Sequence, residues 1–286
     1  MPVTLVRDNY GKERVRLVKV TRHHDRHDIR DITVGIRFEG DYAAVHSAGD
    51  NSTVLPTDTM KNTVYALAHA HPLDEIERFG ATLARHFLGA TTHVSRARVE
   101  IAEHAWSRMI VGGRPHDHAF TRGGDARRVA RVTGMRDGPG ERLTVESGIR
   151  DLVVLKTSGS AFEGYLKDRY TTLRETSDRI FATAVSAIWR YVEEDVAYNT
   201  QWHGVRQLIL ETFADHDSRS VQHTLHAIGD AVLEQCPEIA EIALSLPNKH
   251  HLLADLSPFG LENANEIFIP TDEPYGLIEA VVARAR

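Results

Sequence analysis

The chain has 286 residues, of which 42% are hydrophobic and 26% are charged, and its formal net charge is −6. This composition is typical of a globular protein with one large domain or two of ordinary size. The negative charge argues against a nucleic-acid-binding protein, and no run is long and apolar enough to span a bilayer. We therefore expect neither a nucleic acid nor a membrane as a partner.

Two further features set limits on the class of protein. The N-terminal residues lack the apolar core of a signal peptide, so we expect the chain in the cytoplasm. The single cysteine, Cys236, can form no internal disulfide and no cysteine metal site. We predict that it is a small, buried, apolar residue.

The first half begins with alternating polar and apolar residues, which is the pattern of β-strands. Two strands are predicted, at 14–20 and 32–40, joined by the charged turn at 23–28. An amphipathic helix is predicted at 72–88. Its apolar face consists of Ile76, Phe79, Leu83 and Phe87.

Two more strands are predicted in the first half, at 97–106 and 118–134, the second of them broken at Gly123 and Gly124. The segment 134–142 is rich in Gly and contains a Pro, so it predicts a linker.

The second half repeats this order of elements. The predicted elements are strands at 143–159 and 179–194, helices at 201–213 and 221–236, and strands at 241–246, 251–256 and 266–270. Leu225, Ile228 and Val232 form the apolar stripe of the second helix. Two strands, helices and two strands, occurring twice, predict two similar α+β units with antiparallel sheets and helices on one face. We place these units at 1–136 and 137–286.

The motifs in the sequence give little support for a metal or a nucleotide cofactor. There are 17 histidines, but the close pairs in HDH at 116–118 and HH at 250–251 match no defined zinc spacing. Neighbouring side chains on a regular strand point to opposite faces, so His250 and His251 would not share a ligand. No dinucleotide-binding or phosphate-binding glycine motif is present, and TSGSAF at 157–162 only approaches the serine-hydrolase motif.

Three short polar segments are not covered by these motifs. NYGK at 9–12 places Lys12 just before a strand, and PTDTMKNT at 56–63 predicts a helix start with Thr57 and Asp58 as N-cap residues. SLPNKHH at 245–251 predicts either a polar turn between two strands or a proton-handling site on a sheet. Taken alone, each segment favours an ordinary structural role.

Together with other segments they resemble the urate oxidase (uricase) family. The matching segments, in chain order, are NYGK, VRLVKV, PTDT with KNTVYALA, HAWSR, RPHDHAF, residues 152–180, SVQHT, SLPNKHH and PYGLIEA. The resemblance extends from about residue 9 to residue 282 and indicates a bacterial-type member. It implies two tandem T-fold units per chain, assembling into a tunnel-shaped homotetramer whose active sites are shared between subunits.

The resemblance also implies an activity and a set of site residues. The activity is conversion of urate, O2 and water to 5-hydroxyisourate and hydrogen peroxide, without a metal or organic cofactor. The implied catalytic residues are Lys12, Thr57 and His250. The implied substrate-binding residues are Thr57, Asp58, Phe162, Arg179, Val221, Gln222 and Asn248.

Each implied role has a chemical reason. Phe162 would stack on the purine, Arg179 and Gln222 would bind its edge, and Asp58 and Val221 would contact it through the main chain. Asn248 would hold O2 or water above the ring. In SLPNKHH, we expect Pro247 to set a turn, with Lys249 and His251 pointing away from the site.

Two alternatives from other classes share this architecture. A zinc-dependent enzyme that processes pterins or purines would need a His/Cys ligand set. A non-catalytic purine-binding protein would keep Phe162, Arg179 and Gln222 but would not need Lys12 and Thr57.

Overall fold

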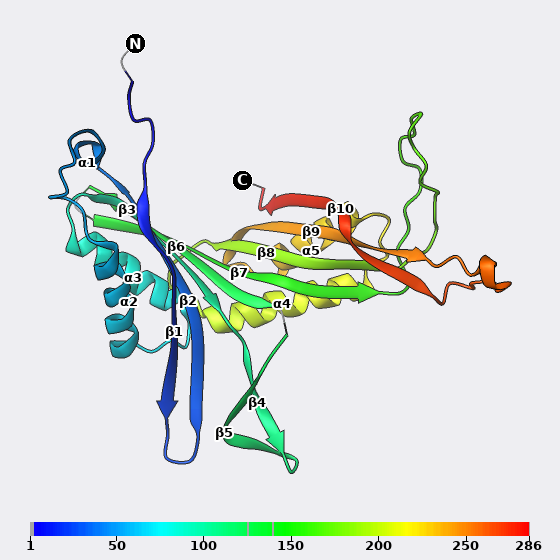
Figure 1. The fold of residues 1–286 in the computed structure, drawn as a ribbon, viewed down its shortest axis with the longest axis horizontal. Helices are drawn as coiled ribbons and strands as arrows, with labels where there is room; N and C mark the ends of the chain where they lie inside the picture. Colours follow the sequence, from blue (N-terminus) through cyan, green and yellow to red (C-terminus); the bar gives the residue numbers. More distant parts are fainter. Residues whose placement is uncertain (1–2, 125, 139, 286) are drawn as a thin grey trace. The chain divides into compact units, whose positions relative to one another are not determined.

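The computed structural model describes residues 3–124, 126–138 and 140–285. Its elements divide into two compact units, which are described separately (Figure 1). Unit 1 comprises Met1–Gly148 and Arg190–Asn199, and unit 2 comprises Ile149–Trp189 and Thr200–Arg286. The boundary at 136/137 between the T-fold units stays a prediction.

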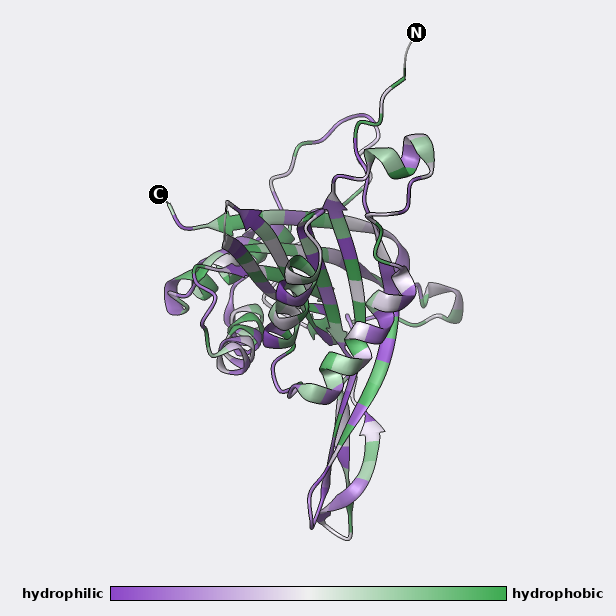
Figure 2. Ribbon diagram, turned by 90° about the vertical axis from the view of Figure 1, so that its left-hand side faces the viewer, coloured by the Kyte–Doolittle hydropathy of each residue, from purple (hydrophilic) through white to green (hydrophobic). Residues whose placement is uncertain are grey.

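Unit 1 is built on an antiparallel sheet in which β1, β2, β3 and β6 are hydrogen-bonded in that order, followed by the first part of β7. These strands are β1 (Tyr10–Arg22), β2 (His27–Gly40), β3 (Val94–Glu103), β6 (Arg127–Asp137) and β7 (Gly140–Lys156). A separate two-stranded sheet pairs β4 (Trp106–Val111) with β5 (Arg114–Arg122). Hydrophobic and hydrophilic residues alternate along the strands, as one face of each is buried (Figure 2).

Three helices belong to unit 1: α1 (Ala43–Ala48), α2 (Thr57–Ala70) and α3 (Ile76–Ala90). Helix α3 packs against β3 and β6, and α2 packs against β1. The four apolar residues predicted for the buried face of α3 are each no more than 1% exposed, so this prediction is confirmed.

A buried polar network lies beneath α3. The Glu77 side chain is fully buried, and its carboxylate accepts hydrogen bonds from Arg128 at 2.6 Å and from the Ser147 hydroxyl at 2.5 Å. The Tyr191 hydroxyl donates to Ser147 at 3.0 Å, and Arg128 also donates to Asn199 at 2.5 Å. The negative charge of the buried carboxylate is balanced by the positive charge of the guanidinium. Through its hydrogen bonds, the network joins α3 to β6, β7, β8 and the start of α4.

Unit 2 contains the second part of β7, followed in the sheet by β8, β9 and β10. Its remaining elements are β8 (Phe181–Tyr191), α4 (Tyr198–Asp215), α5 (Val221–Gln235), β9 (Ile239–Leu253), the short 3-10 helix η1 (Ser257–Phe259) and β10 (Phe268–Ala283). Helix α5 packs against β9 and β10. The Phe213 ring of α4 lies 5.0 Å from that of Phe181 on β8.

Two predictions for the interior of unit 2 are confirmed. The stripe of α5, formed by Leu225, Ile228 and Val232, is buried. Cys236, which follows this helix, is also buried, and burial raises the pKa of its thiol. The predicted fold class, an α+β chain with antiparallel sheets and helices packed on them, is confirmed.

Three boundaries predicted from the sequence are wrong. The segment 97–106 is not one strand, because β3 ends at Glu103 and β4 begins at Trp106. The predicted linker at 134–142 instead contains the end of β6 and the start of β7, and residue 139 lies outside the described residues. Of the glycines in this segment, Gly138 has a φ of 58°, a left-handed conformation that suits glycine in turns and linkers alike.

The predicted turn at SLPNKHH is the third error. Strand β9 passes through residues 245–251 without interruption, and Pro247 lies opposite Leu277 of β10. The irregularity is on the partner strand, where β10 shifts register between Thr271 and Gly276. Pairing with β10 keeps Pro247 extended, which its fixed φ permits.

Candidate functional site

Lys12 lies on β1 beside a β-bulge. Lys12 is opposite Ile36 on β2, whereas the next paired residue, Val15, is opposite Val34, so the register shifts between them. Arg14 within the bulge has a φ of 58°. A bulge of this kind bends a strand and redirects its side chains, so the half-buried Lys12 is placed by a local irregularity of the sheet.

Gly11, the residue before Lys12, lets strand β1 lie close to strand β2. A Cβ atom on Gly11 would lie 1.8 Å from the carbonyl oxygen of Ile36. No side chain can occupy that space, so the approach of β1 to β2 at this point requires glycine.

Thr57 and Asp58 begin helix α2, but they are not its N-cap as predicted. Pro56 takes the N-cap position, and no side chain caps the helix. The extended conformation of Pro56 makes Thr57 the first helical residue. Proline has no N–H group, but at this position it loses no hydrogen bond of the helix, because the first N–H groups of a helix have no partner within it.

The Asp58 carboxylate has its own partners on the helix. It accepts hydrogen bonds from Lys61, three residues on, and from the Asn62 amide at 3.0 Å. The Lys61 hydrogen bond and charge, with a smaller contribution from the Lys12 charge, hold the pKa of Asp58 below its usual value. Lys12 itself forms no hydrogen bond or ion pair with another residue that the structure describes, so its ammonium group is available to a ligand.

Phe162 and Arg179 lie together in unit 2. The Arg179 guanidinium is 5.2 Å from the centre of the Phe162 ring, and burial lowers the pKa of Arg179. Tyr165 stacks parallel to Phe162, with ring centres 4.8 Å apart. The main chain of Phe162 pairs with that of Thr176 in both directions, at 2.8 and 3.2 Å, which brings the two parts of the irregular segment 157–180 side by side.

Ser218 joins this segment to the approach to α5. Its main-chain N–H donates to Gly159 at 3.0 Å, and its carbonyl accepts from Ala161 at 2.7 Å. Its buried hydroxyl donates to the carbonyl of Ser220 and accepts from the Thr224 hydroxyl at 2.7 Å. Ser218 thereby joins the Phe162 segment, through its main chain, to the first turn of α5, through its side chain.

Asp178 performs the corresponding function next to Arg179. Its carboxylate accepts from the Ser158 hydroxyl at 2.7 Å and from the Ser160 N–H at 3.2 Å, and these bonds lower its pKa. Sequence reasoning identified neither Ser218 nor Asp178. The available signal was the clustering of Ser, Asp and Gly around TSGS and ETSDR, which is typical of side chains that bond to nearby main chain.

Val221 and Gln222 are the first two residues of α5. Ser220 is the N-cap, and its hydroxyl accepts from the His223 N–H at 3.1 Å. Val221 is buried, whereas the Gln222 side chain is exposed. The first N–H groups of a helix lack internal partners and carry partial positive charge, so this end of α5 suits an anionic ligand.

Asn248 and His250 lie on β9, opposite the irregular part of β10. Asn248 pairs with Gly276 and His250 with Thr271, so residues 272–275 bulge out opposite Lys249. Lys249 bonds to Asp272 of this bulge at 2.5 Å. Since side chains alternate along a strand, Asn248 and His250 share the face opposite to Lys249 and His251.

The predicted site residues thus form local groups within each unit. In unit 1, the charge of Lys12 acts on Asp58, beside Thr57. In unit 2, the contacts above join Phe162 and Arg179 to the turn that holds Val221 and Gln222. Asn248 and His250 share one strand of that unit.

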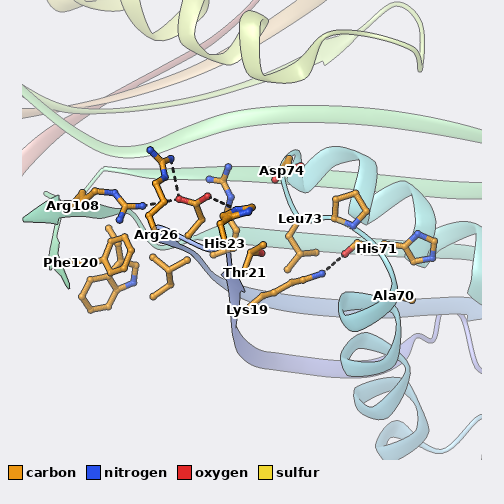
Figure 3. A pocket seen from close by; sticks show the side chains of 15 residues that line it. Lys19, Thr21, His23, Arg26, Ala70, His71, Leu73, Asp74, Arg108 and Phe120 are labelled. Atoms are coloured by element: carbon orange, nitrogen blue, oxygen red, sulfur yellow. Dashed lines mark hydrogen bonds and ion pairs between the residues drawn. The ribbon is translucent and has the colours of Figure 1, made fainter. Parts of the chain in front are cut away.

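A cavity of about 760 Å³ in unit 1 contains none of the predicted site residues (Figure 3). It lies between the β1–β2 hairpin, the end of α2, and strands β4 and β5. Two of its cations already have partners: Lys19 donates to the carbonyls of Ala68 and His71 at 2.8 Å, and Arg108 donates to the carbonyl of His27 at 2.6 Å and to Asp28 at 2.8 Å. We therefore place the candidate site at the groups above.

Among the described residues, no group of three or more His, Cys, Asp or Glu side chains is arranged to hold a metal ion. No helix in this part of the chain is both long and apolar enough to cross a membrane.

The chain is similar to known proteins over nearly its whole length. The family model described as Uricase matches residues 8–133 and 145–279. The uricase of Arthrobacter globiformis is 45% identical over 99% of this chain and 90% of its own length, and that of Danio rerio is 37% identical over 99% and 95%. The crystal structure of Arthrobacter globiformis uricase superposes with a TM-score of 0.93, covering 99% of this chain and 96% of that one. With a family model that matches most of its length, and relatives well above 30% identity from end to end, this chain belongs to the uricase family.

Proposed function

We propose that this chain is a urate oxidase, which converts urate, O2 and water to 5-hydroxyisourate and hydrogen peroxide without a metal or organic cofactor. The observation that carries the proposal is the grouping in unit 2 of an aromatic ring, a desolvated guanidinium and a helix N-terminus, in a chain that belongs to the uricase family. These three groups suit a flat, anionic, electron-rich ligand.

Urate binding is assigned to unit 2. The Phe162 ring stacks on the purine, while Arg179 and the Gln222 amide donate hydrogen bonds to its oxygen and nitrogen edge. The N–H of Val221, at the start of α5, adds a main-chain donor. Tyr165 and Ser218 support these contacts, because they hold Phe162 and the first turn of α5 in place.

Proton transfer is assigned to Lys12, Thr57 and His250. Lys12 has no competing ion pair among the described residues, and in its neutral amine form it can accept a proton from urate through the Thr57 hydroxyl. Asp58 contacts urate through its main chain, since its carboxylate is held by Lys61. Asn248 holds O2 and then water above the ring, and His250, on the same face of β9, moves protons between water and peroxide.

The reaction balances in two stages. Deprotonated urate gives two electrons to O2, which takes up two protons and leaves as hydrogen peroxide. Water then adds to the oxidised purine at C5, losing one proton to the relay, and 5-hydroxyisourate results. The residues supply proton transfer and orientation, and O2 is the oxidant.

We further propose that the chain forms a homotetramer in which Lys12, Thr57 and Asp58 of one subunit meet the unit 2 residues of another. The reaction would take place in the cytoplasm. The division of the residues between the two units supports shared sites.

The test is a spectrophotometric assay on protein stripped of metals. Loss of urate absorbance with release of one hydrogen peroxide per urate is the expected result. If the folded protein leaves urate unchanged, or acts only after one metal is restored, the proposal is wrong.

A further inference from the structure

Two histidines next to the proposed urate-binding residues interact with each other. His216 Nε2 lies 3.2 Å from His223 Nδ1, and the ring centres are 4.3 Å apart. His223 is in the first turn of α5, immediately after Gln222. His216 follows the last residue of α4, so the pair of rings bridges the end of one helix and the start of the next.

The direction of this hydrogen bond follows from a second contact. The main-chain N–H of Arg219 points at the same His223 Nδ1, at 3.4 Å. That nitrogen therefore accepts, and its proton is on Nε2, while His216 donates from Nε2. The arrangement requires Nδ1 of His223 to be unprotonated, because a proton there would repel both donors.

His216 is itself firmly held. Its N–H donates to the carbonyl of Thr212 at 3.0 Å, in the last turn of α4. Its carbonyl accepts from the Lys156 ammonium at 2.5 Å, and this lysine reaches it from β7. Because both contacts hold the main chain of His216, its ring extends toward His223 from a fixed backbone.

We propose that His216 and His223 are positioning residues, whose mutual hydrogen bond holds the first turn of α5 so that Val221 and Gln222 face the purine. This inference rests on the proposed function. Neither imidazole is assigned a contact with urate, so the pair acts through the residues between them. The bond is in addition to the Ser220 cap, which fixes the same turn from the other side.

The surroundings make this arrangement sensitive to pH. The charged groups acting on the pair are Lys156 on β7 and Asp217 in the loop between α4 and α5. Asp178 acts on Lys156. Partial burial, the neighbouring His223 and the Lys156 charge lower the pKa of His216. Because the pKa of His216 is lowered, the unfolded chain binds a proton at His216 more readily than the folded chain does. The contribution of His216 to the stability of the fold is therefore complete above the usual histidine pKa of 6.5 and is lost as pH falls.

A metal ion is a poorer explanation of the same geometry. Two imidazole nitrogens 3.2 Å apart could also face one cation. However, the Lys156 ammonium would repel it, and Arg219 already donates to one of the two nitrogens. The two histidines are therefore assigned to each other.

The test compares three variants by steady-state kinetics between pH 5 and 9. His216→Phe keeps a ring but removes the donor, and we expect KM for urate to rise about threefold to tenfold, with kcat nearly unchanged. His216→Gln keeps a donor for His223 Nδ1 but carries no titratable imidazole beside Lys156. It should therefore restore the KM at pH 8 and abolish the rise in KM that the unmodified protein shows below about pH 6.5.

The matched control is His226→Phe. His226 lies one turn further along α5 than His223, and its exposed ring is paired to Asp230 rather than to either histidine of the pair. Its replacement should change neither KM nor its pH profile. The dissociation constant of xanthine, measured without turnover, should change between variants and with pH in the same way as KM. Protonation of the ligand itself is the same for every variant, so it cannot cause differences between them.

The outcomes separate this inference from the proposed function. Unmodified protein that consumes urate, with equal KM values for His216→Phe and His226→Phe, would overturn the inference and leave the function intact. A His216→Gln variant that keeps the acid rise in KM would also overturn it. Unmodified protein that consumes no urate at any pH would overturn both.

Discussion

The Arg179 guanidinium lies 5.2 Å from the centre of the Phe162 ring, although the two residues are separated by an irregular stretch of chain. The contact depends on the main-chain pairing of Phe162 with Thr176 and on the bonds that Asp178 makes to Ser158 and Ser160. A single segment thereby presents a cation that can bind the edge of a planar ligand and a ring that can stack on the face of that ligand.

Removing the ring should weaken binding. For Phe162→Ala we expect a loss of about 1–3 kcal/mol in urate or xanthine affinity, because stacking and buried area disappear together. Isothermal titration calorimetry is the measurement. Tyr170→Ala, at an exposed position of the same segment, is the control and should bind like the unmodified protein. Equal losses in both variants would indicate a general disturbance of the segment.

Lys12 should affect turnover more than binding. Lys12→Met keeps the aliphatic stem and removes the base, so we expect kcat to fall about 100-fold or more while xanthine still binds. Stopped-flow absorbance of urate is the direct measurement. A Lys12→Met protein with normal turnover would exclude this residue from the proton relay.

The proposed sharing of sites between subunits predicts complementation. Lys12→Ala and His250→Ala should each be almost inactive. In tetramers formed by co-expression of both, about a quarter of the pockets would combine an intact Lys12 with an intact His250. Activity of purified mixed tetramers is the readout. Mixed tetramers as inactive as their parents would place both residues in the same subunit's site.

The buried network should be more important for stability than an exposed ion pair. Glu77→Gln removes the carboxylate that balances the Arg128 charge, and we expect the free energy of unfolding to fall by about 3–5 kcal/mol. Glu13→Gln, which breaks the exposed pair with Arg37, should cost less than about 1 kcal/mol. Urea unfolding followed by circular dichroism compares them. Similar losses would show that burial of the Glu77 pair has no special effect.

Asp31 gives a pH-dependent prediction. Burial alone would raise its pKa, but hydrogen bonds from Arg16, at 3.0 and 2.8 Å, and from Trp106, at 3.0 Å, outweigh it and lower the pKa below 3.8. Because the unfolded chain then binds the proton more readily, stability is complete above pH 3.8 and is lost as pH falls further.

The measurement for Asp31 is urea unfolding between pH 3 and 7. Asp31→Asn should be less stable at neutral pH and should lose less stability on acidification than the unmodified protein. Parallel acid profiles for the two proteins would mean that another carboxylate controls the acid transition.

The sequence predicted those elements whose pattern is contained within one segment. The buried faces of α3 and α5 repeat with the helical period, so Phe79 and Ile228 could be placed from the sequence. Strand limits could not be placed as well. Pro247 is typical of a turn, yet it is kept extended by β10, and no local pattern reports pairing with a later strand.

The candidate site shows the same division. The resemblance to the uricase family identified Phe162 and Arg179. It did not identify the residues that hold these two in place. Ser218 and Asp178 act through main-chain contacts in an irregular segment, where neither helical nor strand periodicity applies. The Thr57 N-cap was predicted from side-chain preference, whereas the conformation of Pro56 decides the helix start.

The burial of Cys236 has a practical consequence. Only 6% of this residue is exposed, and its raised pKa keeps the thiol protonated, so it should react slowly with maleimides. A cysteine introduced at an exposed position, such as Leu166, would be labelled selectively without first removing the native one. Two populations of subunits could then carry different fluorophores, and energy transfer between them would count mixed oligomers directly.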